Sequence, residues 1–325
     1  MSSLNPEIFS KASEQVNAIR TEINKAVIGQ ESVVDQVLMT LLASGHVLIE
    51  GVPGLGKTLL VRALAACFGC KFGRIQFTPD LMPSDVTGHA IYDMKSEEFK
   101  IRRGPAFTNL LLADEINRAP AKTQAALLEV MQEKQITIEG RPLPLQPPFM
   151  VLATQNPIEQ EGTYPLPEAE LDRFMLKVSI DYPSLEAEKN LVSLVTTNKL
   201  SDVLDVSELQ QVVSPEGVIK LQKVTAQVDV DDQVLDYAIR IIHATRAWQG
   251  LNHGAGPRGG IALIRVARAR ALLRGQHFVT PDDVKTVAPA ALRHRLGLAA
   301  ELEIEGLSVE EVLKNLLDSV AAPRS

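Results

Sequence analysis

The first half of the chain alternates short apolar runs with stretches in which apolar residues recur at helical spacing. This alternation is typical of a parallel sheet covered by helices. Helices are predicted at Glu31–Ser44, Thr58–Phe68 and Ala121–Glu133. Five apolar runs have the length of buried strands: Val47–Glu50, Gly73–Thr78, Leu110–Asp114, Met150–Thr154 and Met175–Ile180. The pattern therefore predicts an α/β fold around a five-stranded parallel sheet.

Two segments between these strands have a different pattern. Residues 81–104 contain two short β-like pieces, around Ala90–Met94 and Glu98–Arg102. Residues 135–148 alternate apolar and polar side chains around Glu139-Gly140-Arg141 and end in prolines. We therefore expect each segment to form a hairpin that is inserted into the α/β core.

The second half of the chain is mainly helical in pattern. Nearly all periodic stretches after Ser184 are amphipathic helices. Thr280-Pro281-Asp282-Asp283 is a strong helix start, with a Thr cap, Pro at the first position and acids in the first turn. The sequence therefore predicts an α/β domain over residues 1–183 and an all-α domain over residues 184–325.

Composition narrows the class of protein. Hydrophobic residues make up 45% of the chain and charged residues 22%, which is typical of a globular protein with a substantial core. Met1–Gln15 lacks the apolar centre of a signal peptide, and no run approaches the roughly 18 apolar residues of a membrane span. We therefore expect no membrane span and a cytoplasmic location.

Charge and cysteine content argue against two further functions. The net charge of −7 disfavours general nucleic-acid binding. Residues 251–295 hold eight Lys and Arg against two acids, but no aromatic stripe accompanies them, so a cleft or subunit contact is favoured there. Cys67 and Cys70 stand as C-x-x-C, which suggests a redox pair or half a zinc site. Without a second pair, we interpret them as reduced cysteines near packed structure.

The strongest chemical signal is GVPGLGKT, which matches G-x-x-x-x-G-K-[ST] in full. It follows a predicted strand and opens a predicted helix, as a phosphate-binding loop must. Backbone N–H groups and the helix N-terminus then hold phosphate oxygens, Lys57 reaches the β- and γ-phosphates, and Thr58 binds magnesium. The candidate phosphate-binding residues are Gly51, Val52, Pro53, Gly54, Leu55, Gly56, Lys57 and Thr58.

Two further strand ends supply the other parts of a hydrolytic site. Asp114 ends an apolar strand and is the second candidate magnesium ligand. Glu115 follows it and is the candidate group that orients and deprotonates the attacking water. Asn156 ends the next strand, where its amide could position that water, although Asn before Pro is also a common turn residue.

These motifs together carry a family resemblance. VIGQ (27–30), GVPGLGKT, LLLADEINRA, ATQNP, YPLPEAELDRF and GPR resemble a MoxR-type AAA+ ATPase. This branch also contains magnesium-chelatase ATPase subunits, and the two expected hairpins fit its characteristic insertions. The resemblance covers nearly the whole chain. It implies a P-loop NTPase core with a C-terminal helical lid, and a preference for ATP over GTP.

The resemblance also implies roles for residues that no local pattern assigns. Val27, Ile28 and Gly29 would border the adenine. Arg258, in the GPR motif, would reach the γ-phosphate from the lid as a second sensor. Arg173 would be an arginine finger offered to a neighbouring subunit, and it remains open whether Arg118 also faces a neighbour. Arginine suits these roles because its planar fork spreads charge over phosphate oxygens.

The implied biology is an ATP-driven ring, with six subunits as the family expectation. ATP would bind between the two domains and across a subunit boundary, and hydrolysis would tilt the lid and move the hairpins. The leading function is chaperone-like remodelling or maturation of partner proteins, among them a protein with a von Willebrand factor A domain. The alternatives are a metal-insertion motor like magnesium chelatase and a nucleotide-gated scaffold. The sequence does not identify the client or the partner.

Overall fold

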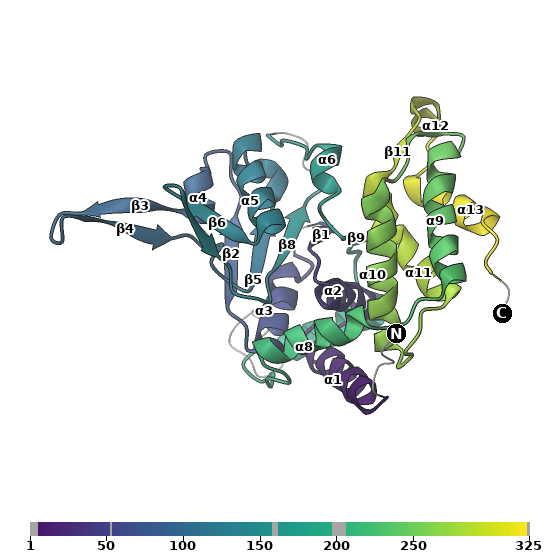
Figure 1. Ribbon diagram of the computed structural model, residues 1–325, viewed down its shortest axis with the longest axis horizontal. Coiled ribbons are helices and arrows are strands. Elements are labelled where there is room, and N and C mark those ends of the chain that lie inside the picture. Colours follow the sequence, from purple (N-terminus) through teal and green to yellow (C-terminus); the bar gives the residue numbers. More distant parts are fainter. Residues whose placement is uncertain (1–5, 53, 158–161, 197–205, 324–325) are drawn as a thin grey trace.

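The computed structural model describes residues 6–52, 54–157, 162–196 and 206–323. Its centre is a parallel sheet in the order β2-β5-β8-β1-β9 (Figure 1). The strands are β1 (Val47–Glu50), β2 (Phe72–Gln76), β5 (Leu110–Asp114), β8 (Met150–Gln155) and β9 (Leu176–Ser179). The predicted five-stranded parallel sheet is therefore confirmed, with small differences at the strand ends.

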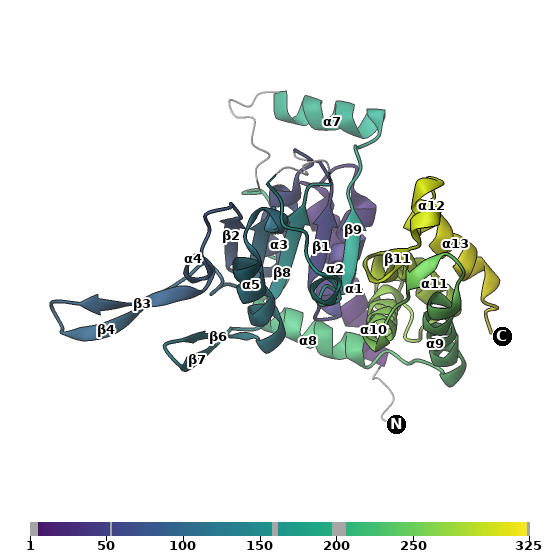
Figure 2. The same cartoon turned by 90° about the horizontal axis from the view of Figure 1, so that it is seen from above.

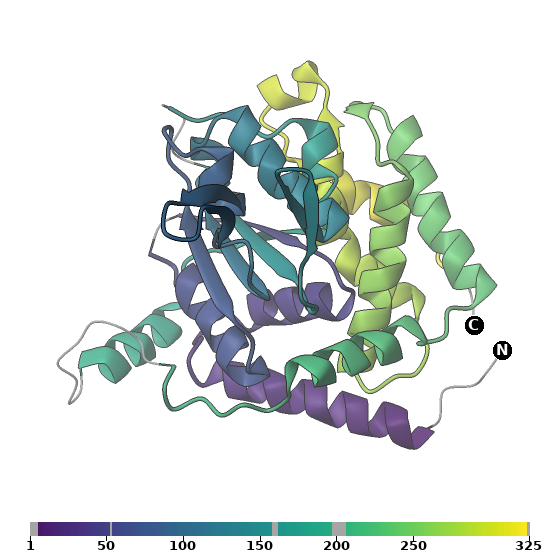
Figure 3. The same ribbon diagram turned by 60° about the vertical axis from the view of Figure 1, so that its left-hand side comes forward.

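Both faces of this sheet are buried under helices. Successive side chains of a strand point to opposite faces, so one strand contributes to two hydrophobic cores. Val47 and Ile49 of β1 belong to one hydrophobic core together with helices from both halves of the chain. Leu48 belongs to a second core, together with α5 (Ala121–Glu133). The helices that the first half of the chain contributes to this core are α1 (Pro6–Asn24), α2 (Glu31–Leu42) and α3 (Lys57–Phe68). Figure 3 shows α5 and these helices on opposite sides of the sheet.

Both expected hairpins are present. The first joins β3 (Gly88–Asp93) to β4 (Glu98–Arg103) after the short α4 (Pro83–Thr87), and it projects far from the body of the molecule (Figure 1). The second joins β6 (Gln135–Ile138) to β7 (Arg141–Pro144). Its two-residue turn, Glu139–Gly140, has positive φ angles of 49° and 71°, as a tight hairpin turn requires.

The C-terminal part is a helical domain with one small addition. Its principal helices are α8 (Pro215–Ala226), α9 (Asp232–Ala247), α10 (Pro257–Leu273), α11 (Pro281–Leu292) and α13 (Val309–Ser319), with the short α12 (Ala300–Ile304). The domain is not entirely α, because β10 (Leu251–His253) pairs with β11 (Gly297–Leu298). The predicted start of α11 is confirmed: Thr280 and Asp283 each accept a hydrogen bond from the other's backbone N–H.

The helical domain packs beside the sheet. α10 contacts α1 and α2, and α11 contacts β9 at the edge of the sheet (Figure 1). Packing one helix against two others needs small residues, and α10 supplies buried glycines and alanines along its length. Helix α7 (Leu185–Thr196) lies apart from the other C-terminal helices, on the far side of the sheet from α8 (Figure 2). The domain boundary near residue 183 stays a prediction.

Within these described segments, no helix combines the length and apolar character needed to cross a membrane.

Candidate nucleotide site

The GVPGLGKT loop follows β1, and α3 begins at its lysine. Gly54 and Gly56 have φ angles of 86° and 76°, a region that favours glycine. A methyl group added to either would meet no atom within 4 Å, so open space lies beside the loop. The start of α3 directs backbone N–H groups into that space, which is the arrangement that binds phosphate. Pro53, also predicted to bind phosphate, lies outside the described residues.

Lys57 is held close to the loop and to the acidic residues. Its amino group donates a hydrogen bond to the carbonyl oxygen of Gly51. Burial lowers the pKa of Lys57, and the carboxylates of Asp114, Glu115 and Glu50 oppose that shift. The structure therefore brings the predicted phosphate-binding lysine and the predicted acidic pair together.

Asp114 ends β5, and both of its carboxylate oxygens accept hydrogen bonds. The hydroxyl of Thr154 donates to Oδ1 at 2.7 Å, and the guanidinium of Arg74 donates to Oδ2 at 2.7 Å. Thr154 comes from the neighbouring strand β8, and Arg74 comes from β2 on the other side. The two flanking strands thus fix the orientation of this carboxylate.

Glu115 has a left-handed backbone conformation, with φ 56° and ψ 51°. A non-glycine residue there is strained by about 1 kcal/mol, and such strain is concentrated at functional sites. Its N–H donates to the hydroxyl of Thr154 at 2.9 Å. Its Oε2 accepts from Gln76 at 2.8 Å and from Arg118 at 3.1 Å. Arg118 therefore contacts the acidic pair of its own chain, and its relation to a neighbour stays a prediction.

Asn156 directly follows β8, which lies between β5 and β1 in the sheet. Its side chain is buried. The carbonyl of the preceding residue, Gln155, accepts a hydrogen bond of 3.3 Å from the N–H of Gly51. Because parallel strands end at the same edge, Asn156 lies between the phosphate loop and the acidic pair, as a water-positioning group must.

A pocket of 460 Å³ adjoins the phosphate loop. Val27 and Ile28 line it together with Gly54, Leu55 and Gly56, and the side-chain amide of Gln30 donates to the carbonyl of Leu55 at 3.0 Å. The volume and mostly apolar lining fit a small organic ligand such as a nucleotide base. The remaining lining residues, which sequence reasoning did not select, come mainly from α7 and the segment before it: Tyr182, Pro183, Glu188, Leu191, Val192 and Thr196.

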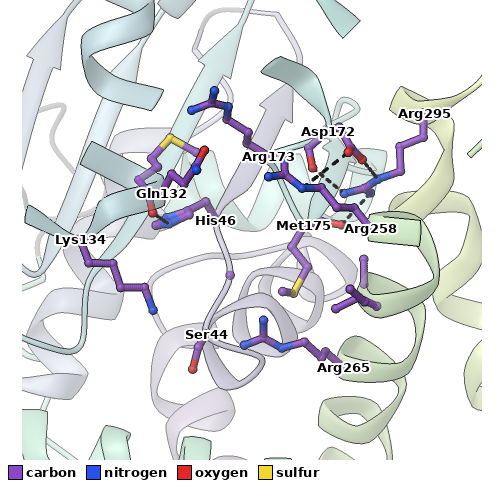
Figure 4. A pocket seen from close by; sticks show the side chains of 14 residues that line it. Ser44, His46, Gln132, Lys134, Asp172, Arg173, Met175, Arg258, Arg265 and Arg295 are labelled. Atoms are coloured by element: carbon purple, nitrogen blue, oxygen red, sulfur yellow. Dashed lines mark hydrogen bonds and ion pairs between the residues drawn. The ribbon is translucent and has the colours of Figure 1, made fainter. Parts of the chain in front are cut away.

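The two predicted catalytic arginines lie elsewhere. Arg173 and Arg258 line a second cavity of 320 Å³, together with Ser44, Gly45 and His46 (Figure 4). Those three residues precede β1, whereas the phosphate loop follows it, and a four-residue strand spans about 13 Å. The structure therefore does not bring Arg258 to the loop of its own chain, because the lid packs beside β9 rather than over the loop. The role of Arg258 stays a prediction.

Thr58 and Asp114 supply the kind of ligands that magnesium prefers, a hydroxyl oxygen and a carboxylate. Each oxygen of Asp114 accepts one hydrogen bond and keeps a second lone pair. The residues therefore fit a hard cation that takes its other ligands from phosphate and water. Among the described residues, no cluster of three or more His, Cys, Asp and Glu side chains could hold a metal.

Sequence reasoning missed three residues around the acidic pair: Arg74, Gln76 and Thr154. The alternation of Arg74 and Gln76 in a predicted strand indicated that both point to one face, but only the strand order places that face beside β5. Thr154 was the last residue of the predicted apolar strand Met150–Thr154. A hydroxyl group at the end of an otherwise apolar strand was the signal that could have identified Thr154 as part of the site.

Cys67 and Cys70 carry free thiols. Burial raises the pKa of Cys67 to about 12 and that of Cys70 to about 11. A thiol must lose its proton before it acts as a nucleophile or metal ligand, so these values favour a packing role.

A strand that leads into a glycine-rich phosphate loop, with an acidic pair at the same sheet edge, defines a P-loop ATPase. The chain matches the "ATPase family associated with various cellular activities (AAA)" over residues 46–176 and the "AAA lid domain" over residues 243–316. The acidic pair and Asn156 lie in the first match, and Arg258 lies in the second.

Two relatives and one solved structure cover almost the whole chain. "Chaperone MoxR1" of Mycobacterium tuberculosis is 44% identical, over 93% of this chain and 81% of that protein. "Uncharacterized protein YeaC" of Bacillus subtilis is 46% identical, over 93% and 92%. The crystal structure of a Cytophaga hutchinsonii protein, provisionally described as an ATPase, has a TM-score of 0.90 and 40% identity, covering 98% of each chain. The chain belongs to the MoxR family of AAA ATPases. Magnesium-chelatase subunits match more weakly, with 27% identity for that of Acidiphilium rubrum over 92% of this chain and 98% of that protein.

Proposed function

We propose that this ATPase works as a ring, with six subunits, in which each ATP is bound by one subunit and completed by the next. The observation that carries this proposal is the placement of Arg173 and Arg258 at the sheet edge opposite the phosphate loop. An arginine at that edge meets a triphosphate only if a neighbour presents one. Contacts that join one edge of a subunit to the opposite edge of the next are head-to-tail, and a closing rotation turns them into a ring.

In this proposal, the chain's own residues prepare the water and hold the triphosphate. Lys57 contacts the β- and γ-phosphates, Glu115 orients and deprotonates the water, and Asn156 holds that water in line with the γ-phosphate. Magnesium, when bound, would be held by Thr58 and Asp114 and would neutralise phosphate charge. Arg173 and Arg258 of the neighbour would stabilise the charge that develops on the transferred group.

The base would occupy the pocket beside the loop. Val27 and Ile28, which line the pocket, would border the base on one side, with α7 on the other. Gly29 does not line the pocket but lies against Ala187 of α7, so its part in bordering the base stays a proposal. The pocket lining is mostly apolar, which supports a planar purine held chiefly by packing. The preference for ATP over GTP is part of the proposal.

The projecting β3–β4 hairpin would contact the protein on which the ring acts. Several large apolar side chains of this hairpin are exposed, with Met94 at 85% and Phe99 at 72% exposure. Tyr92 packs edge-on against Phe99, with ring centroids 5.3 Å apart. An apolar, aromatic patch on an extended arm is suited to contact with another protein. Loss of the γ-phosphate would release the neighbour's arginines, and the resulting movement would be transmitted to a bound protein.

We therefore favour chaperone-like remodelling or maturation of partner proteins in the cytoplasm. The relative from Mycobacterium tuberculosis is named a chaperone, which supports this class of function. A protein with a von Willebrand factor A domain is the partner that we propose.

A metal-insertion motor is the second candidate. The more distant magnesium-chelatase relatives favour it. Chelation of magnesium into a tetrapyrrole, assayed with chelatase partner subunits, would distinguish it from remodelling.

Exchange of Glu115 for Gln tests the proposed chemistry. The variant should bind ATP and assemble, while steady-state turnover should fall by about 10²- to 10⁴-fold. Glu129→Gln is the matched control, because Glu129 is exposed on α5. Near-normal turnover of Glu115→Gln would remove this residue from its role. In a pull-down with ATP, the Glu115→Gln variant should retain more client protein than the unchanged protein does. Equal retention by the two proteins would instead favour a scaffold that does not need hydrolysis.

A further inference from the structure

The Arg295 side chain is a buried cation that joins the helical domain to the segment carrying Arg173. It ends a short 3₁₀ helix that follows α11, and only 4% of the side chain is exposed. Its Nε donates to Oδ1 of Asp172 at 2.6 Å. Its Nη2 donates to the carbonyl oxygens of Phe174 at 2.7 Å and Asp172 at 3.1 Å.

The remaining nitrogen of Arg295 also has two acceptors, one in the helical domain and one in the segment that carries Arg173. Nη1 donates to the carbonyl of Ala291 in α11 and to the carbonyl of Met175 at 3.3 Å. Every nitrogen of the guanidinium is therefore occupied. A buried charge is strongly destabilising unless it is paired and fully hydrogen-bonded, so this geometry fixes residues 172–175 tightly against the end of α11.

Asp172 extends this connection to Arg258. Its second carboxylate oxygen, Oδ2, lies 3.9 Å from Nε of Arg258. One carboxylate thus lies between a buried arginine and a half-exposed one, and it directly precedes Arg173 in the chain (Figure 4). Arg173 itself donates to the carbonyl of Leu128 in α5 at 3.0 Å.

The surrounding cavity has an excess of positive charge. Asp172 is the single acidic residue among the described residues that line it. Five cationic side chains line the same space: Lys134, Arg173, Arg258, Arg265 and Arg295. A cavity with this balance favours a polyanion such as a triphosphate, provided that its arginines are held in a fixed arrangement.

We propose that Arg295 is a positioning residue. It fixes Asp172, and through Asp172 it sets the separation of Arg173 and Arg258, so that both guanidiniums are presented together to the phosphates bound by the neighbouring subunit. This inference rests on the proposed action of those arginines in trans. Arg295 does not contact the nucleotide, and its effect is confined to the site that the neighbour supplies.

The test uses Arg295→Lys, which keeps the charge but cannot reproduce the fork of donors. The variant has an intact phosphate loop and acidic pair, so ATP binding and the KM for ATP should be little changed. Misplacement of the arginines should lower kcat roughly a hundredfold. Arg274→Lys is the matched control, because Arg274 pairs with the buried Asp283 inside the helical domain and does not contact residues 172–175. Its kcat should stay close to that of the unchanged protein.

Mixed rings separate positioning in trans from an effect on the variant's own fold. Lys57→Ala subunits cannot hydrolyse ATP but carry normally placed arginines. Mixed one to one with Arg295→Lys subunits, they should restore turnover at about a quarter of all sites, where an intact loop meets a correctly placed pair of arginines. A double variant, Arg173→Ala with Arg295→Lys, should lose little beyond the loss from Arg173→Ala alone.

Each outcome has a definite reading. If Arg173→Ala is restored by Lys57→Ala subunits and Arg295→Lys is not, the positioning inference is overturned while the shared site stands. If neither is restored, the shared site itself fails, and the inference fails with it. Should Arg295→Lys fail to fold, Asp172→Asn replaces it in the same mixtures, with Asp236→Asn as its control, since Asp236 pairs with Arg240 on an exposed helix face.

Discussion

The hydroxyl of Thr154 donates a hydrogen bond of 2.7 Å to Oδ1 of Asp114. The same hydroxyl oxygen accepts the N–H of Glu115 at 2.9 Å. One hydroxyl on β8 therefore orients the proposed magnesium ligand and holds the strained backbone of the proposed catalytic carboxylate.

Thr154→Val should impair both stability and turnover. The substitution leaves the N–H of Glu115 without its acceptor in a buried site, which destabilises the fold by about 1–3 kcal/mol. The acidic pair loses its common support, so kcat should fall roughly a hundredfold. Urea unfolding and a steady-state ATPase assay measure the two effects. Thr154→Ser keeps the hydroxyl and should behave much like the unchanged protein, and equal activity of the Val and Ser variants would contradict the prediction.

Gln76→Leu should raise basal ATP turnover. In the described structure, the amide of Gln76 donates to Oε2 of Glu115 at 2.8 Å and occupies an oxygen that hydrolysis needs. Removal of a hydrogen bond worth on the order of 1 kcal/mol corresponds to about a fivefold increase in rate. Single-turnover hydrolysis at saturating ATP measures the chemical step. A decrease would show instead that Gln76 supports Glu115 in its active orientation.

Gly29→Ala should weaken ATP binding. Gly29 has a φ of 74°, and an added methyl group would lie 2.6 Å from Cβ of Ala187 in α7. Helix α7 would have to move away from the base pocket that it lines, and we expect about a tenfold rise in the Kd for ATP. Gly140→Ala is a close control, because Gly140 has a φ of 71° but open space around it. Titration with a fluorescent ATP analogue should separate the two variants.

His46 should make the protein less stable in mild acid. Its Nδ1 accepts the N–H of Val151 at 2.9 Å, so Nε2 carries the proton and donates to the carbonyl of Met131 at 3.1 Å. Burial lowers the pKa of His46 to about 4, against about 6.5 in an unfolded chain. Between pH 6.5 and pH 4, His46 is protonated in the unfolded state but stays neutral in the folded state. Stability present above pH 6.5 is therefore lost as the pH falls to about 4, by about 3 kcal/mol.

His46→Gln should flatten this pH dependence, since glutamine takes up no proton. Urea unfolding between pH 7 and pH 4.5 measures the slope. The exposed His243 provides the control, and His243→Gln should keep the slope of the unchanged protein. An unchanged slope in His46→Gln would assign the acid sensitivity to other groups, such as His294, whose pKa burial also lowers.

The sequence by itself determined the type of each element and the parts of the site that lie at strand ends. Local spacing distinguishes a buried strand from a helix, and a residue that follows a parallel strand must lie at the carboxyl edge of the sheet. For this reason the order of residues along the chain is enough to place the loop, Asp114, Glu115 and Asn156 on one edge of the sheet. Their catalytic roles stay predictions.

Only the tertiary structure decided which strands are neighbours and where the helical domain lies. The order β2-β5-β8-β1-β9 places Arg74 and Gln76 beside the acidic pair, although about 40 residues of chain separate them. Packing of α10 on α1 and α2 carries Arg258 to the edge opposite the loop and makes Arg295 a link to Asp172. Such placements depend on the fit of distant surfaces, which local periodicity does not encode.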